Sequence, residues 1–299
     1  MPNVKLKHHL HLHFIVFIWG FTAVLGALIS IDAMPLVWYR MGMAVLVLLI
    51  FAFFTKRTLR QSPKAILQFS IVGFFIAVHW ICFFYAIKIS NVSITLAAMS
   101  TGALFGSFIE PIFYKKKINF YEVFFALVAM LGLLVIFKVQ KGYTMGLIFG
   151  LIASFLAALF AILNSKLIKK YKATPMTFYE LFAGFLFITI VLLFKGNFLE
   201  PSFFHLSLMD GFYIFILASI CTAYTMVASN KLLLNMSPFS MLLTINLEPV
   251  YGIILAIVIL GDKEVMAPKF YLGTALIIIS IILNAALKLY PKILAYKKR

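Results

Sequence analysis

A series of apolar segments, each long enough to cross a membrane, most constrains what this 299-residue chain can fold into. A membrane-spanning α-helix needs about 20 apolar residues, because it rises 1.5 Å per residue through a hydrocarbon layer about 30 Å thick. Ten such segments follow one another with short connections. They cover residues 12–31, 35–54, 65–87, 92–113, 120–138, 143–165, 175–195, 211–232, 237–260 and 269–288. The pattern predicts an all-α membrane protein with ten transmembrane helices.

The composition supports a membrane class and argues against a nucleic-acid partner. Apolar residues make up 64% of the chain and charged residues only 12%, whereas soluble domains average about 25% charged residues. The formal net charge of +17 could suggest nucleic acid. The basic residues, however, lie between the apolar segments instead of forming one compact basic domain, so membrane topology explains them better.

The positions of the basic residues predict the orientation of the helices. Lys and Arg concentrate at both ends of the chain and in every second connection. Cytoplasmic loops of membrane proteins carry this excess, so both termini are expected in the cytoplasm of a plasma-membrane protein. The main clusters are Lys56-Arg57, Lys115–Lys117, Lys169-Lys170 and Lys297–Arg299.

Two short matches within the chain indicate an internal repeat. Pro35–Arg40 opens the second segment, and the similar Pro175–Glu180 opens the seventh, 140 residues later. Asn91-Val-Ser93 and Asn235-Met-Ser237 precede the fourth and ninth segments, 144 residues apart. Five helices per copy is an odd number, so the copies would face opposite ways across the membrane. Inverted repeats of this kind are typical of secondary transporters.

Charged residues inside the apolar segments are the main functional candidates, because hydrocarbon does not solvate them. Arg40 and Glu180 lie about five residues into their segments, at equivalent places in the two copies. They could form polar gates or contact a substrate, or their side chains could reach the nearby interface. Glu110 is expected close to the cytoplasmic surface, in a structural or gating role.

Glu248 is the strongest single candidate. It lies about 12 residues into a 24-residue segment, near the depth at which transporters bind their substrates. Pro249 follows it and removes a backbone donor, which predicts a helix kink facing a cavity. Pro111 follows Glu110 in the same way. Asn246 lies two residues before Glu248 and is expected to share its site.

Aromatic and imidazole side chains recur near the same depth and are expected to line the substrate site. Each could instead be a packing or interface residue, as Tyr and Trp often are. The histidine could accept a proton or be bonded to a neighbour. The candidates are Trp19, His79, Trp80, Tyr85, Tyr224 and Tyr251.

A set of short motifs is spread over both halves of the chain. They are Trp19-Gly20, Arg40, the small residues before Pro111, Leu247–Val250, Leu260–Asp262 and Tyr271–Gly273. Together they resemble the EamA family of the drug/metabolite transporter superfamily. Departures exist: Asp262 stands where Glu is usual, and Lys115–Lys117 replaces the corresponding Leu-Gly-Glu ending in the first half.

The resemblance implies ten helices in two EamA-like repeats, covering residues 1–141 and 142–299. It also implies a secondary transporter of a small metabolite in the bacterial inner membrane, and export, because most relatives export. Alternating access would move the solute. The charges of Arg40 and Glu180 favour an amino acid or similar amphiphilic molecule as the substrate, and protons are a candidate coupling ion. The partners are thus a small solute and the lipid bilayer, with a monomer or homodimer as the expected assembly.

Other classes of function have weaker signals. An intramembrane lipid-modifying enzyme would need clustered catalytic residues, and the spacing from His205 to Asp210 is its only sign. A non-transporting scaffold or sensor would have no use for Glu248. The sequence has no P-loop, zinc-protease or nucleophile-elbow motif. Cys82 and Cys221 lie in apolar segments and are expected to pack as small apolar residues. We therefore expect neither an enzyme nor a bound metal or cofactor.

Overall fold

The computed structural model describes residues 2–115, 117, 120–139, 141–196, 198, 200–236, 241, 244–245 and 247–297. Over these ranges the chain is helical apart from short turns and loops, and it contains no strand. The fold class is therefore all-α, as predicted.

The first half of the chain holds six helices that follow the predicted segments closely. The fourth predicted helix is divided into two pieces, α4 and α5, so six helices cover five segments. Their bounds are α1 (Pro2–Leu28), α2 (Ala33–Phe54), α3 (Pro63–Ile89), α4 (Val92–Met99), α5 (Gly102–Tyr114) and α6 (Phe120–Val139).

The second half repeats this order with different interruptions. Short 3-10 turns at Lys141–Tyr143, Pro201–Phe204 and Gly261–Glu264 precede α7, α9 and α13. A π-helical segment, η4, joins α9 to α10. The elements are α7 (Thr144–Leu167), α8 (Ala173–Lys195), α9 (Leu208–Ala218), η4 (Ser219–Tyr224), α10 (Thr225–Leu232), α12 (Glu248–Leu260) and α13 (Pro268–Lys297).

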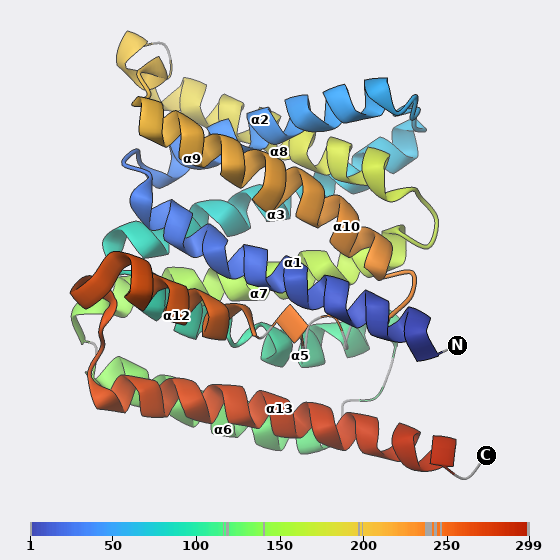
Figure 1. Ribbon diagram of the computed structural model, residues 1–299, viewed down its shortest axis with the longest axis vertical. Helices are drawn as coiled ribbons and strands as arrows, with labels where there is room; N and C mark the ends of the chain where they lie inside the picture. The colour runs from blue at the N-terminus through green and yellow to red at the C-terminus, as the bar shows by residue number, and fades with distance from the viewer. Residues whose placement is uncertain are drawn as a thin grey trace.

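Seven helices of the described chain are long and apolar enough to cross a membrane. Helices α6, α12 and α13 lie beside them in the same bundle (Figure 1). The ninth predicted segment begins at Ser237, outside the described residues, so the count of ten spans stays a prediction. The seven cover Leu6–Leu28, Ala33–Phe54, Pro63–Ile89, Val92–Tyr114, Thr144–Leu167, Ala173–Lys195 and Leu208–Leu232.

The helices run alongside one another, with the pair α6 and α13 along one edge of the bundle (Figure 1). Glycines allow this pair to approach closely. A Cβ on Gly132 would lie 2.7 Å from the carbonyl oxygen of Gly273, and one on Gly273 would lie 2.8 Å from that of Gly132. The start of α1 and the end of α13 lie at the same end of the bundle (Figure 1); their cytoplasmic location stays a prediction.

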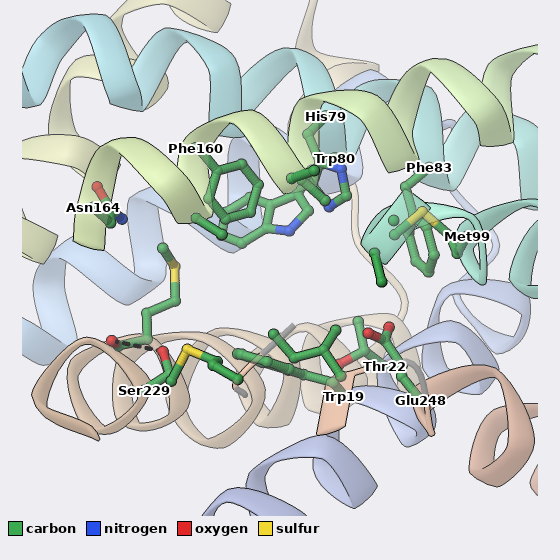
Figure 2. Close-up of a pocket in the computed structure, with 18 of the residues that line it drawn as sticks. Trp19, Thr22, His79, Trp80, Phe83, Met99, Phe160, Asn164, Ser229 and Glu248 are labelled. Atoms are coloured by element: carbon green, nitrogen blue, oxygen red, sulfur yellow. Dashed lines mark hydrogen bonds between the residues drawn. The ribbon is translucent and has the colours of Figure 1, made fainter. Parts of the chain in front are cut away.

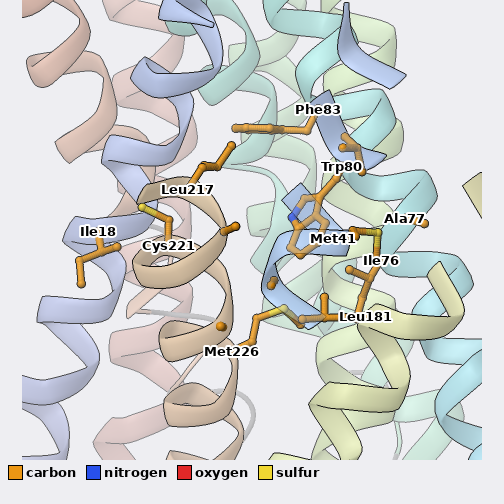
Figure 3. Packing of buried hydrophobic residues seen from close by; sticks show 14 of the residues in the cluster. Ile18, Met41, Ile76, Ala77, Trp80, Phe83, Leu181, Leu217, Cys221 and Met226 are labelled. Atoms are coloured by element: carbon orange, nitrogen blue, oxygen red, sulfur yellow. The ribbon is translucent and has the colours of Figure 1, made fainter. Parts of the chain in front are cut away.

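Helices α2, α3 and α8 pack with the α9–α10 segment around a buried apolar cluster. Figure 3 shows Met41, Ile76 and Leu181 meeting in this cluster, while Leu217 reaches toward Phe83 and Cys221 lies on the side of Ile18. Both cysteines are buried and unbridged, as expected of small apolar side chains. This packing fixes α2, α3 and the α9–α10 segment, which carry several side chains of the candidate site.

Helix α1 differs at both ends from the predicted 12–31. It begins at Pro2. Proline is well tolerated in a first helical turn, because the N–H groups there have no intrahelical partner. The helix ends at Leu28, four residues before the Asp32 N-cap of α2.

The fourth segment is broken where an unbroken helix was expected. The interruption falls at Ser100 and Thr101, between α4 and α5. Neighbouring hydroxyl groups replace the lost backbone hydrogen bonds: Thr101 Oγ1 bonds Ser154 Oγ of α7 at 3.0 Å, and Ser154 Oγ donates to the Met99 carbonyl at 3.1 Å. Non-helical backbone at membrane depth is tolerated where other protein groups satisfy it in this way.

Candidate functional site

A cavity of about 120 Å³ lies between the helices of the two halves. Its lining is largely aromatic and aliphatic, with a few polar and charged groups. Figure 2 shows two facing walls, with His79, Trp80, Phe160 and Asn164 on one and Trp19, Thr22, Ser229 and Glu248 on the other. Apolar cavities with a small number of placed polar groups are the usual form of small-molecule sites.

The crossing of α1 and α12 places Trp19 and Glu248 on the same wall. A Cβ on Gly20 would lie 3.0 Å from the backbone nitrogen of Gly252, and one on Gly252 would lie 3.1 Å from the carbonyl oxygen of Gly20. The absence of a side chain at both positions lets the two helices approach this closely. The Trp19 indole N–H donates to Thr225 Oγ1 at 3.0 Å, which orients the ring at the cavity.

Glu248 is the first residue of α12, and Pro249 stands in the first turn of that helix. A missing N–H costs little there, because the first N–H groups of a helix have no intrahelical partner. Pro249 therefore begins a helix instead of kinking the interior of one. Pro111 is buried inside α5, near its end at Tyr114, and the break in that span lies earlier, at Thr101.

Arg40 turns inward to the cavity and not outward to the interface. Its side chain is only 2% exposed, its Nε donates to Thr222 Oγ1 at 2.7 Å, and its guanidinium carbon lies 3.8 Å from the Trp80 ring centroid. Nη1 is buried and has no hydrogen-bond partner in the described part of the chain. The guanidinium is thus held on one side and has donor capacity left for a ligand.

The π-helical segment η4 supplies the acceptor for Arg40. Thr222 Oγ1 itself donates to the carbonyl of Leu217, five residues back, at 2.7 Å. Thr225, one residue after η4, donates to the Cys221 carbonyl at 2.8 Å while it accepts from Trp19. One irregular turn therefore anchors two side chains of the cavity, in keeping with the frequent use of π-turns at functional sites.

Arg40 and Glu248 are the two charged residues of the cavity lining. Arg40 lies against Trp80, and Glu248 lies on the facing wall (Figure 2). Among the described residues, no hydrogen bond or ion pair joins their side chains. The cavity thus presents a cation and an anion that remain separate.

His79 is anchored by one ring nitrogen. Its Nδ1 lies 2.7 Å from the carbonyl oxygen of Ala153, and since a carbonyl only accepts, Nδ1 carries the hydrogen. The ring packs between Phe83 and Phe160, with centroids 6.1 Å and 5.3 Å away. The Nε2 of a neutral His79 is then an acceptor. A proton-accepting role stays a prediction.

Tyr224 does not line the cavity, contrary to the prediction. It is 43% exposed, and its hydroxyl bonds His11 Nε2 at 2.8 Å. The reason is the π-helical turn, which directs Thr222 toward Arg40 and leaves Tyr224 on the outer face of the same turn.

Tyr85 and Tyr251 also face away from the cavity, so both predictions are wrong. Tyr85 is 42% exposed and packs edge-on against Phe149, with centroids 4.8 Å apart. It follows the cavity residue Phe83 by two positions, about 200° around the helix at 3.6 residues per turn. Tyr251 packs against Phe17, outside the cavity, with centroids 5.8 Å apart.

The remaining candidates lie outside the cavity or outside the described chain. Asn246 is not among the described residues. Glu110 is half-buried on α5 and does not line the cavity. Glu180 is fully buried on α8, behind the cavity residue Asn164. The sequence analysis did not include Asn164, which lies at the end of the predicted segment 143–165 and lines the cavity.

Comparison with known proteins identifies the family of the chain. The sequence profile described as the EamA-like transporter family matches residues 9–138 and, a second time, residues 144–286. The chain belongs to the EamA-like transporter family. It is therefore a membrane transporter of the drug/metabolite superfamily, with a small-molecule substrate and the lipid bilayer as its surroundings. No curated protein matches the chain.

A solved structure titled only "Crystal structure of protein" has a similar fold. It is 13% identical, with a TM-score of 0.67, and the match covers 94% of this chain and 98% of the other. This likeness concerns the fold alone. Within the EamA-like chain, residues from both matched ranges line the cavity, since α1 to α5 belong to the first and α7, α10 and α12 to the second.

Proposed function

We propose that the chain is a secondary transporter that exports an amino acid or a similar amphiphilic solute across the bacterial inner membrane by alternating access. One observation carries the proposal: Arg40 and Glu248 present opposite charges to one cavity without pairing with each other. A zwitterionic solute could satisfy both.

The charges of such a solute match the unoccupied capacity of the two side chains. A carboxylate would accept hydrogen bonds from the Arg40 guanidinium, whose Nη1 lacks a partner in the described chain. An ammonium group would donate to Glu248. Hydrogen bonds to charged groups contribute about 1.5–3 kcal/mol each, or roughly 10- to 150-fold in affinity. Trp19, Trp80 and Phe160 would cover the apolar part of the solute.

Two helix starts in corresponding places support alternating access. α5 begins after Thr101, and α12 begins after Leu247, 146 residues later. This separation is close to the 144 residues between the two Asn-x-Ser motifs. The first residues of both helices, including Gly102 and Glu248, line the cavity. Helix ends at the substrate site are typical of transporters built from inverted repeats.

Hydrogen bonds between the two halves support a conformation that is closed on the predicted outer side. Asp210, at the start of α9, accepts from the backbone N–H of Ser30 at 2.7 Å and from its hydroxyl at 2.6 Å. The Glu264 carboxylate accepts from the backbone N–H groups of Val92 and Ser93 at 3.0 Å and 2.8 Å. Opening toward the outside would have to release these bonds.

The test is transport by the purified protein in liposomes loaded with a mixture of amino acids, with efflux followed by mass spectrometry. Wild-type protein should release one or more of them faster than empty liposomes do. Glu248→Gln and Arg40→Met should abolish that release while remaining folded, and Tyr224→Phe is the matched control because Tyr224 lies outside the cavity. Unchanged release by Glu248→Gln would contradict the assigned site.

A further inference from the structure

Glu180 is a buried acid for which the proposed solute site has no use. Its side chain is 0% exposed, and it lies seven residues after Ala173, the first residue of α8, about 10 Å along the helix axis. A Cβ on Gly73 of α3 would lie 2.9 Å from the carbonyl carbon of Glu180. The close crossing of α3 and α8 therefore covers this residue.

The hydrogen bonding around Glu180 is incomplete, because two buried acceptors there lack a donor. Its Oε2 lies 3.5 Å from Asn164 Nδ2, which is long for a hydrogen bond. In the described chain, Glu180 Oε1 and Asn164 Oδ1 are both buried without any partner. An ionised carboxylate offers acceptors only, so it leaves both of these acceptors without a donor.

A protonated Glu180 supplies the missing donor. Heavy-atom positions alone do not fix which end of the Asn164 amide is the oxygen. With the amide turned by 180°, its oxygen would face the carboxyl group and accept a hydrogen bond from the carboxyl O–H. The alternative, an ionised carboxylate in a fully buried place with one long contact, would cost several kcal/mol.

Within the described part of the chain, no neighbouring cation forms an ion pair with Glu180. The elements around it are α2, α3 and α10, together with α7 through Asn164. Among the described residues, none of their titratable groups forms an ion pair with Glu180. Four of their basic groups donate to other acceptors, namely Arg40, His79, Lys88 and Lys166. The other two, Lys64 and Lys231, are exposed.

Asn164 connects Glu180 to the cavity, because its side chain lines the cavity wall (Figure 2). A second amide, Asn230, also lines the cavity. It donates at 3.1 Å to Oγ1 of Thr177, which lies almost one helical turn before Glu180. A proton released from the Glu180 carboxyl group could thus pass to cavity water beside Asn164 and leave the carboxylate behind.

We propose that Glu180 is the proton-binding site of this transporter, exchanging its proton with the cavity through Asn164, and that this proton is the coupling ion. The coupling rests on the proposed transport function, whereas the proton binding does not. The two parts are therefore tested separately.

Proton binding is tested by infrared difference spectroscopy of the detergent-purified protein between about pH 9 and pH 6, a range in which ordinary Asp and Glu side chains stay ionised. The wild-type spectrum should contain a carbonyl band of a protonated carboxylic acid that Glu180→Gln lacks. Glu200→Gln is the matched control, because Glu200 is exposed, and it should keep this band. If Glu180→Gln does not fold, Asn164→Ala should shift the frequency of the band. An identical band in wild type and Glu180→Gln, or in wild type and Asn164→Ala, would overturn the proposal.

Coupling is tested in liposomes with the same amino-acid mixture. Glu180→Gln should still exchange labelled for unlabelled amino acid at equilibrium. Its accumulation driven by an imposed pH gradient should fall to the level reached without a gradient. Gradient-driven accumulation equal to that of wild type would overturn the coupling role. If wild-type protein moves no amino acid, the proposed function fails, while the infrared titration still decides whether Glu180 binds the proton.

Discussion

Replacing Thr222 by valine tests how the structure holds Arg40. Valine has nearly the shape of threonine, but it lacks the hydroxyl that accepts from Arg40 Nε at 2.7 Å. Nε would stay buried without a partner, at a cost of about 1–3 kcal/mol. The free energy of unfolding should fall by that amount, whereas Thr222→Ser, which keeps the acceptor, should change it by about 0.5 kcal/mol or less. Unfolding by sodium dodecyl sulfate in mixed micelles, followed by tryptophan fluorescence, measures both values.

A double-mutant cycle shows whether this cost comes from Arg40. Arg40→Met removes the guanidinium, so Thr222→Val should cost much less in that background than in the wild type. The resulting coupling energy should be about 1–3 kcal/mol. Free energies that add to within about 0.5 kcal/mol would refute the reasoning, because the two side chains would then act independently.

Three further predictions use other parts of the structure. Gly73→Ala would push a methyl group against the backbone of Glu180 and should lower the free energy of unfolding by about 1–3 kcal/mol or more; Gly142→Ala, which meets no atom within 4 Å, should leave it unchanged. Glu264→Ala removes the acceptor of the first two N–H groups of α4 and should cost about 1–3 kcal/mol per group. An unchanged midpoint of thermal unfolding in detergent would show that these two hydrogen bonds do not stabilise the fold. Tyr224→Phe should transport at the wild-type rate. A several-fold loss of transport rate would show that the Tyr224 hydroxyl takes part in transport.

The sequence predicted the helices well, because their length and apolar content are set by the membrane. The segment expected at 35–54 is α2 at Ala33–Phe54, and the one expected at 65–87 is α3 at Pro63–Ile89. The short extension of α3 follows from its cap: the Ser62 side chain accepts from the backbone N–H of Ala65, which a hydropathy window does not detect.

The irregular turns could not be predicted, because their partners come from distant segments. The break at Thr101 depends on Ser154 of α7, 53 residues further along the chain. The π-helical turn depends on Arg40 and Trp19, which bond Thr222 and Thr225 from two other helices. A single segment read alone looks like an uninterrupted helix in both cases.

Depth in the membrane was predictable for the site, but direction around the helix was not. Counting residues from the helix ends placed Trp19, His79, Trp80 and Glu248 at the level of the cavity, and all four line it. Tyr224 belongs to the same π-helical turn as Thr222 yet faces outward. This direction could not be predicted, because no periodic pattern fixes rotation in helices that are apolar all round.

The most direct test of the central claim is the affinity of the purified wild-type protein for three related ligands, measured by tryptophan fluorescence. These are phenylalanine, the amine that lacks its carboxylate and the acid that lacks its amino group. If Arg40 and Glu248 hold the two charges of one solute, the zwitterion should bind at least about tenfold more tightly than either analogue. Arg40→Met should lose the preference over the amine, and Glu248→Gln the preference over the acid. Equal affinity of the wild-type protein for all three ligands would contradict the account.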